Sequence, residues 1–247
     1  MLSAPSERPH QPLTEFYSLP EERPEYIAHL FDASAVHYDW ISSILSFGTD
    51  RYYRRLALKK AGLERTMRLL DVATGTGLVA RAALDLQLPK ANIIGLDPSL
   101  GMLRQNHETT GIALFQGFGE TLPFRSDSFD FITMGYALRH VESLPRLFSE
   151  FRRVLKPGGR ALVLEISRPD SILLGAALKG YMAAIVPLIA RLRTSSAELG
   201  ELLRYYWATI EHCVPPPTIV SALERAEFRL VERRRFGPML NDYLAEK

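Results

Sequence analysis

The chain has 247 residues, of which 47% are hydrophobic and 23% charged, as expected for one globular domain with a substantial core. A formal net charge of +2 gives no signal for nucleic acid, and no Cys/His cluster has metal-ligand spacing, so we expect neither partner. Cys213 is the one cysteine, which excludes an intramolecular disulfide and indicates a reducing, cytoplasmic compartment.

The first segments of the chain are predicted to lie outside the main sheet. Residues 1–24 are rich in proline and glutamate and lack the apolar core of a secretory signal, so we expect a flexible tail. Residues 25–62 repeat apolar side chains with a helical period and are predicted to form a helical lid over the ligand site. Tyr38 and Asp39 are the polar residues that this lid would best contribute to the site.

A short apolar run then ends in Asp71, turns through small residues and continues as a helical pattern. Glycines at 75 and 77 would let the backbone approach a ligand, which the free N–H groups of the new helix could bind. The spacing also fits the dinucleotide fingerprint, with Asp97 placed to hold a ribose diol. The Asp71 carboxylate would repel a pyrophosphate but suits the cationic amino-acid end of S-adenosylmethionine (SAM), so we predict a SAM site. The contacts expected from this turn are Asp71, Ala73, Thr74, Gly75, Thr76 and Gly77. An unliganded glycine turn is the alternative.

Strands predicted at 92–97, 112–116, 128–134 and 160–166 alternate with helices or turns. This rhythm predicts a Rossmann-like α/β fold, with a mostly parallel sheet covered by helices on both faces. Ligand chemistry then belongs at the carboxyl ends of the strands, where Asp71, Asp97, 135–140 and 165–168 all fall. Residues 66–168 are the predicted SAM-binding core, and a helix and closing hairpin over 215–247 would complete seven strands.

Residues 172–190 carry one charge, Lys179, and approach the length of a membrane span. Gly180 and Pro187 interrupt the run, and its apolar residues recur with helical period, which favours an apolar helical cap over 170–214. Residues 25–247 would thus form one domain. Two further partners remain alternatives. Residues 172–192 of the cap could contact a membrane surface peripherally, and the chain could pair with a second copy of itself.

The chain resembles the UbiE-type C-methyltransferases of ubiquinone and menaquinone biosynthesis, a family of class I SAM-dependent methyltransferases. The resemblance covers residues 31–228 and is carried by Phe31-Asp32, Tyr38-Asp39 with Leu45-Ser-Phe-Gly48, the turn at 71–77, Leu122-Pro-Phe124, Leu138-Arg139 and Val154-Leu-Lys-Pro-Gly-Gly-Arg160. It implies SAM as cofactor, S-adenosylhomocysteine as product, and SAM contacts at Thr76, Asp97, Phe118, Gly119 and Gly135. We add Pro98 and Met102, which open the helix after the second strand.

The resemblance also implies carbon methylation of a hydrophobic, quinol-like acceptor, with the catalytic group at Tyr38, Arg139 and His140. A phenol has a pKa of about 10 and needs a base, while arginine stays charged. We therefore assign Arg139 to stabilising the phenolate, His140 to taking the proton and Tyr38 to orienting them. An O- or N-methyltransferase of a secondary metabolite or phospholipid and a non-catalytic SAM-fold partner protein remain alternatives. The chain departs from the family at Phe118, where an Asn or Asp usually binds adenine, and at His140, where the family has Asn.

Overall fold

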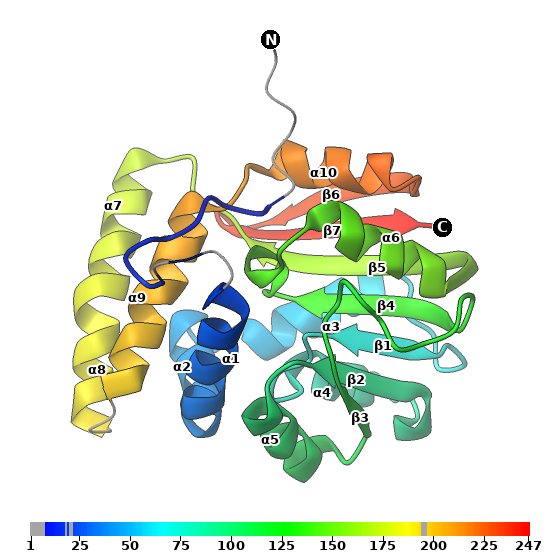
Figure 1. Ribbon diagram of the computed structural model, residues 1–247, viewed down its shortest axis with the longest axis horizontal. Coiled ribbons are helices and arrows are strands. Elements are labelled where there is room, and N and C mark those ends of the chain that lie inside the picture. The colour runs from blue at the N-terminus through cyan, green and yellow to red at the C-terminus, as the bar shows by residue number, and fades with distance from the viewer. Residues whose placement is uncertain (1–7, 18, 20–21, 194–196) are drawn as a thin grey trace.

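The computed structural model describes residues 8–17, 19, 22–193 and 197–247. Within them, seven strands form one sheet in the order β3-β2-β1-β4-β5-β7-β6 (Figure 1). β1 to β5 run parallel, and β7 is antiparallel to both of its neighbours. The predicted mostly parallel, seven-stranded sheet is confirmed. The strands are β1 (Leu69–Val72), β2 (Ile93–Asp97), β3 (Ala113–Gln116), β4 (Phe129–Gly135), β5 (Leu155–Ile166), β6 (Arg229–Phe236) and β7 (Leu240–Glu246).

Helices cover both faces of this sheet (Figure 1). Apolar side chains of α6 (Leu144–Val154) and α10 (Pro216–Arg225) pack in one core cluster with strand residues, and those of α3 (Asp50–Lys60) and α4 (Leu78–Asp85) pack in a second cluster. Central parallel strands are apolar because both of their faces are covered. α5 (Leu100–Thr110) follows β2, and short 3-10 turns lie at Lys90–Asn92 and Leu138–His140.

A separate helical layer lies at one end of the sheet and contains the cap segment and the first part of the predicted lid (Figure 1). This part of the lid forms α1 (Arg23–Ser34), a 3-10 turn (Ala35–His37) and α2 (Tyr38–Leu45), whereas α3 at the end of the predicted lid packs against the sheet. The cap segment forms α7 (Ile172–Gly180), a π-helical turn (Tyr181–Ile185), α8 (Val186–Arg193) and α9 (Ala197–His212). Side chains from both segments share a third apolar cluster. No helix in the described part of the chain is long and apolar enough to cross a membrane.

The structure differs from the predicted flexible tail from residue 8 onward. Leu13 and Tyr17 are buried in the cluster that the lid and cap share. The Pro9 carbonyl accepts a hydrogen bond from the Val214 amide at 2.7 Å, which ties this segment to the end of the cap. Helix α1 begins at Arg23, inside the expected tail. The prediction for residues 1–7, 18, 20 and 21 lies outside the described residues. A short segment without periodic patterning gives no local sign of such long-range contacts, which explains the difference.

Two smaller differences concern element ends. The strand predicted at 160–166 begins earlier, at Leu155. Its pairing with β4 moves from Leu155 opposite Phe129 to Arg160 opposite Phe131, so residues 156–159 bulge from the ladder. Helix α5 begins at Leu100, because the Ser99 hydroxyl accepts the Met102 amide as its cap, and Pro98 precedes the helix.

Candidate active site

A cavity of about 350 Å³ lies between α1 and the carboxyl ends of β1, β2 and β4. The open-sheet rule places ligands there. Of the predicted site residues, those that line it are Tyr38, Ala73, Gly75, Asp97, Pro98, Met102, Phe118, Gly119, Gly135 and His140. The structure brings these together from five separate stretches of sequence. Asp71, Thr74, Thr76, Gly77 and Arg139 do not line the cavity.

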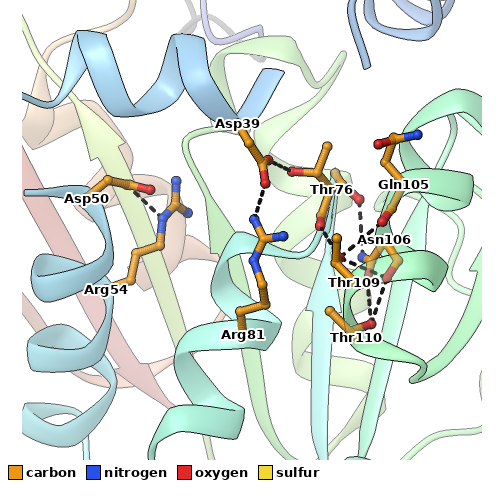
Figure 2. A network of polar contacts seen from close by, with 10 residues as sticks. Asp39, Asp50, Arg54, Thr76, Arg81, Gln105, Asn106, Thr109 and Thr110 are labelled. Atoms are coloured by element: carbon orange, nitrogen blue, oxygen red, sulfur yellow. Dashed lines mark hydrogen bonds and ion pairs between the residues drawn. The ribbon is translucent and has the colours of Figure 1, made fainter. Parts of the chain in front are cut away.

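The β1–α4 turn has the backbone that its glycines predict. Gly75 has φ +55°, and a Cβ atom built on it would meet nothing within 4 Å, so the backbone here faces open space that a ligand can approach. Gly77 has φ +87°, and its Cβ would lie 2.6 Å from Asn106 Oδ1. Asn106 in turn donates to the Gly75 carbonyl at 3.2 Å, so α5 holds the turn in place (Figure 2).

Asp71 supports this turn from behind rather than facing the cavity. Its carboxylate is fully buried and accepts hydrogen bonds from Thr74 Oγ1 at 2.6 Å and Thr133 Oγ1 at 2.7 Å. Burial raises the pKa of Asp71 to about 6, against the lowering effect of these two hydroxyls. Both carboxylate oxygens are thus held by the chain's own threonines, and a contact of Asp71 with the amino-acid end of SAM, directly or through water, stays a prediction.

Asp97, at the end of β2, is a predicted acidic site residue that does line the cavity. Its Oδ2 accepts a hydrogen bond from the Gly75 amide at 2.8 Å, and its Oδ1 accepts one from the Ser99 amide at 2.9 Å. Asp97 therefore links the turn after β1 to the turn after β2. Burial raises the pKa of Asp97 to about 6. Phe118 is 49% exposed on the same wall and offers a ring face for stacking. An open glycine backbone, a carboxylate and an aromatic face fit the diol and base of a nucleoside.

Two carboxylates of the lid bind the turns that follow β1 and β2. Asp39, on α2, accepts a hydrogen bond from Thr76 Oγ1 at 2.5 Å and pairs with Arg81 of α4 at 2.5 Å (Figure 2). Asp32, on α1, accepts the hydroxyl of Ser99 and, at 2.8 Å, the amide of Gly101 at the start of α5. The predicted cofactor residue Thr76 thus serves the lid contact in this structure.

The inner end of the cavity carries Tyr38 and His140. Tyr38 Oη lies 2.7 Å from Tyr206 Oη of α9, and burial raises the Tyr38 pKa well above its usual range. The His140 ring stacks on Tyr205 with centroids 5.5 Å apart, and neither ring nitrogen has a hydrogen-bond partner among the described residues. Burial, then the nearby charges of Arg139 and Arg23, lower the His140 pKa well below its usual range. The imidazole is therefore neutral at pH 7.

Arg139 lies behind this wall in a buried ion pair. Its Nη1 donates to Glu165 Oε1 at 2.5 Å, its Nε donates to Thr209 Oγ1 at 3.1 Å, and its guanidinium lies over the Tyr206 ring. The side chain is fully buried. The structure therefore does not bring the guanidinium to the place where it was expected to stabilise a phenolate.

Sequence reasoning missed several cavity residues. Arg23, Ile27 and Phe31 of α1 line the cavity, as do Ser99 and Tyr136. The helical period of the lid carried a signal for Ile27 and Phe31, but Arg23 fell in the expected tail. Tyr136 has φ +61°, and the Arg54 guanidinium lies 4.6 Å from its ring centroid, held in turn by Asp50 (Figure 2). Nothing local in the sequence indicates that backbone conformation.

Fold and site together define a class I SAM-dependent methyltransferase: a doubly covered sheet with a glycine turn after β1 and an acidic residue ending β2. Solved structures support the fold. A SAM-dependent methyltransferase from Thermotoga maritima matches with a TM-score of 0.63 at 20% identity, over 90% of this chain and 99% of that one. Phosphoethanolamine N-methyltransferase 2 from Haemonchus contortus, solved with S-adenosyl-L-methionine, matches with a TM-score of 0.62 at 18% identity, over 92% of this chain and 58% of that one.

The family model of the ubiE/COQ5 methyltransferases matches residues 19–239. The ubiquinone/menaquinone biosynthesis C-methyltransferase UbiE of Syntrophotalea carbinolica is 35% identical over 83% of this chain and 86% of its own length. The demethylmenaquinone methyltransferase of Lactiplantibacillus plantarum is 33% identical over 84% of this chain and 90% of its own length. The chain belongs to the ubiE/COQ5 methyltransferase family and is a SAM-dependent enzyme. The resemblance stated from sequence is confirmed.

Proposed function

We propose that this enzyme methylates a ring carbon of a hydrophobic quinol. The observation that carries the proposal is one cavity lined both by the Gly75 turn and Asp97 and by the apolar Ile27 and Phe31 beside His140. The first pair suits the cofactor, and the second pair suits an apolar ring whose hydroxyl reaches His140. The names of the two relatives, which act in ubiquinone and menaquinone biosynthesis or on demethylmenaquinone, support a quinol acceptor.

SAM, when bound, supplies an electrophilic methyl group on a sulfonium. The chain's part is to align the acceptor carbon and exclude water, and alignment can lower a barrier by about 7–11 kcal/mol. His140 is neutral, so it can accept the proton of the acceptor hydroxyl, and its depressed pKa means that it passes the proton on rather than keeping it. Tyr38, through its contact with Tyr206, orients the acceptor beside His140.

The proposal is tested with purified enzyme, SAM and reduced demethylmenaquinone as the probe. We expect a product heavier by one methyl group, with the new bond at a ring carbon. The matching observation in cells is a deletion strain that accumulates the demethylated quinone. An unchanged quinone pool, together with no product in the assay, would contradict the proposed acceptor.

We also propose that the cap contacts a membrane surface, where such an acceptor would reside. Ile172 and Leu173, at the start of α7, are 87% and 84% exposed, and Ile185 and Leu188 add further exposed apolar surface to the cap. Isolated apolar residues on a surface are ordinary, but several exposed apolar residues on one cap segment favour an interaction site. We expect the enzyme to float with liposomes and the variant Ile172→Glu/Leu173→Glu to float less. Absence of binding to any lipid mixture would remove this proposal and leave the acceptor proposal standing.

A further inference from the structure

The wall of the cavity carries a buried cation that forms an ion pair with no carboxylate in the described part of the chain. Arg23, the first residue of α1, lines the cavity and is 4% exposed. Its Nη1 donates to the Val141 carbonyl at 2.9 Å and its Nη2 to the Arg139 carbonyl at 3.0 Å. No ion pair of the described residues includes Arg23, and its Nε has no partner among them. A buried cation without a counter-charge is costly, so the site gains if a ligand supplies one.

Two carboxylates, Glu120 and Glu142, line the same cavity, but neither forms an ion pair with Arg23, and Glu120 instead accepts a hydrogen bond from the Glu142 amide. The other polar groups around Arg23 do not supply a negative charge either. His10, in the N-terminal segment, has its Nε2 3.1 Å from Arg23 Nη2, and burial lowers its pKa to about 4, so it is neutral. Tyr205, on α9, has its pKa raised to about 12 by burial and is neutral as well. Arg139, on the loop after β4, is cationic, and its charge is matched by Glu165. Arg146 also lines the cavity but is exposed to solvent, so the buried positive charge left unmatched is that of Arg23.

His140 lies beside this charge in the same wall. Arg23 donates hydrogen bonds to the carbonyls of Arg139 and Val141, the two residues that flank His140. These bonds fix the Arg23 guanidinium relative to the His140 imidazole. Both His140 ring nitrogens are buried and have no partner among the described residues. The inner end therefore offers one cation and one neutral proton acceptor, next to apolar Ile27 and Phe31. A phenol that loses its proton there leaves an oxygen anion facing the cation.

We propose that Arg23 binds the ionised oxygen of the methyl acceptor, so that the cavity selects phenolic acceptors that bind as phenolates. The acceptor O–H bond breaks, the proton goes to His140 and then to solvent, and the electron pair stays on the oxygen beside Arg23. This gives Arg23 the role that we assigned to Arg139 from the sequence, and it rests on the proposed function in taking the acceptor to be phenolic. A charge beside the oxygen lowers the pKa of the bound phenol.

The test uses para-nitrophenol, whose phenolate absorbs visible light, with the full chain saturated with S-adenosylhomocysteine. We expect the bound probe to ionise at a lower pH than free probe. Arg23→Gln should raise the pKa of the bound probe by about one unit or more, a tenfold change in the ionisation constant. Arg23→Lys keeps the charge and should retain most of the shift. Arg104→Gln removes an exposed arginine from α5, outside the cavity, and should change nothing.

Calorimetry with S-adenosylhomocysteine shows that each variant is folded, because that affinity should be the same in all. The proposal is overturned if wild-type enzyme binds the probe without a shift, if Arg23→Gln keeps the wild-type shift, or if Arg23→Lys loses as much as Arg23→Gln. These results are independent of the acceptor assay. A phenolate shift without methylation of the quinol removes the quinol proposal alone, and methylation with no effect of Arg23→Gln removes this inference alone.

Discussion

Single residues decide how the cofactor site responds to pH. The carboxyl of Asp97 is buried and its pKa is raised to about 6. An ionised carboxylate accepts hydrogen bonds from a diol better than a protonated one does. We therefore expect the affinity for S-adenosylhomocysteine to fall as pH drops below about 6. Asp97→Asn should lower that affinity by roughly 10- to 150-fold at pH 7.5 and flatten the pH profile, since the loss of a hydrogen bond to a charged group costs about 1.5–3 kcal/mol. Calorimetry from pH 5 to 8 measures both, and a flat wild-type profile would contradict the assignment.

Stability responds to pH in the opposite direction through Asp71. Its pKa is about 6 in the folded chain against 3.8 as the ordinary value, so the folded state binds the proton more tightly. The contribution of Asp71 is then fully present below about pH 4 and is lost as pH rises through about 6. In the Asp71→Asn variant, we expect the free energy of unfolding to decline less over this pH window than it does in the wild type. Urea denaturation at several pH values measures this difference. An Asn variant with the same pH slope as wild type would show that Asp71 titrates normally.

Arg139 and His140 are neighbours in sequence with different expected roles. Arg139→Gln leaves Glu165 buried without its partner, which should lower the free energy of unfolding by about 3–5 kcal/mol. Replacing both members, as Arg139→Met/Glu165→Leu, should cost less, because no charge is then left unpaired. Urea denaturation measures both variants, and equal losses in the two would argue against a coupled pair.

His140→Ala should lower turnover by about a hundredfold, the low end for proton-transfer groups, while leaving the affinity for S-adenosylhomocysteine unchanged. The low end is expected because the depressed pKa makes His140 a weak base. Turnover of demethylmenaquinol measures the first effect and calorimetry the second. Unchanged turnover would leave the residue with a packing role against Tyr205.

At the scale of elements, two lid helices depend on carboxylates to reach the cofactor turns. The double variant Asp32→Asn/Asp39→Asn weakens the contacts to Ser99, Thr76 and Arg81. Each partly exposed contact contributes up to about 1 kcal/mol, so we expect a three- to tenfold weaker affinity for S-adenosylhomocysteine. Asp85→Asn, which removes an exposed pair with Arg51, is the matched control and should bind normally. Equal affinities in both variants would separate lid packing from cofactor binding.

The elements also show what could be predicted from sequence. The apolar runs placed β1, β2 and β4 well, and the glycine turn was placed correctly, because these signals are local. The sequence shows that Asp71 ends a strand but not which way its side chain points, and in the fold that direction is set by Thr74 and Thr133. The Arg139–Glu165 pair and the burial of Arg23 depend on residues far apart in the chain, and no spacing rule indicates such contacts.

At the scale of the whole molecule, the lid, the cap and the N-terminal segment share one apolar cluster. Leu13→Ala should lower the free energy of unfolding by about 2–3 kcal/mol, the ordinary cost of emptying a buried leucine site. Leu19→Ala, at a half-exposed position of the same segment, is the control and should change stability little. Denaturation midpoints measure both, and similar values for the two would mean that the segment is not packed in solution.

The two borders of the sheet have a consequence for self-association. The edge strand β3 has only four residues. The other edge strand, β6, carries the exposed Arg229, Arg233 and Arg235. Short or positively charged edge strands discourage strands of another molecule from pairing with the sheet. Growth into ribbons or fibrils is therefore disfavoured on both sides, and concentrated solutions should stay clear. Two copies that associate are therefore expected to do so through surfaces other than the strand edges.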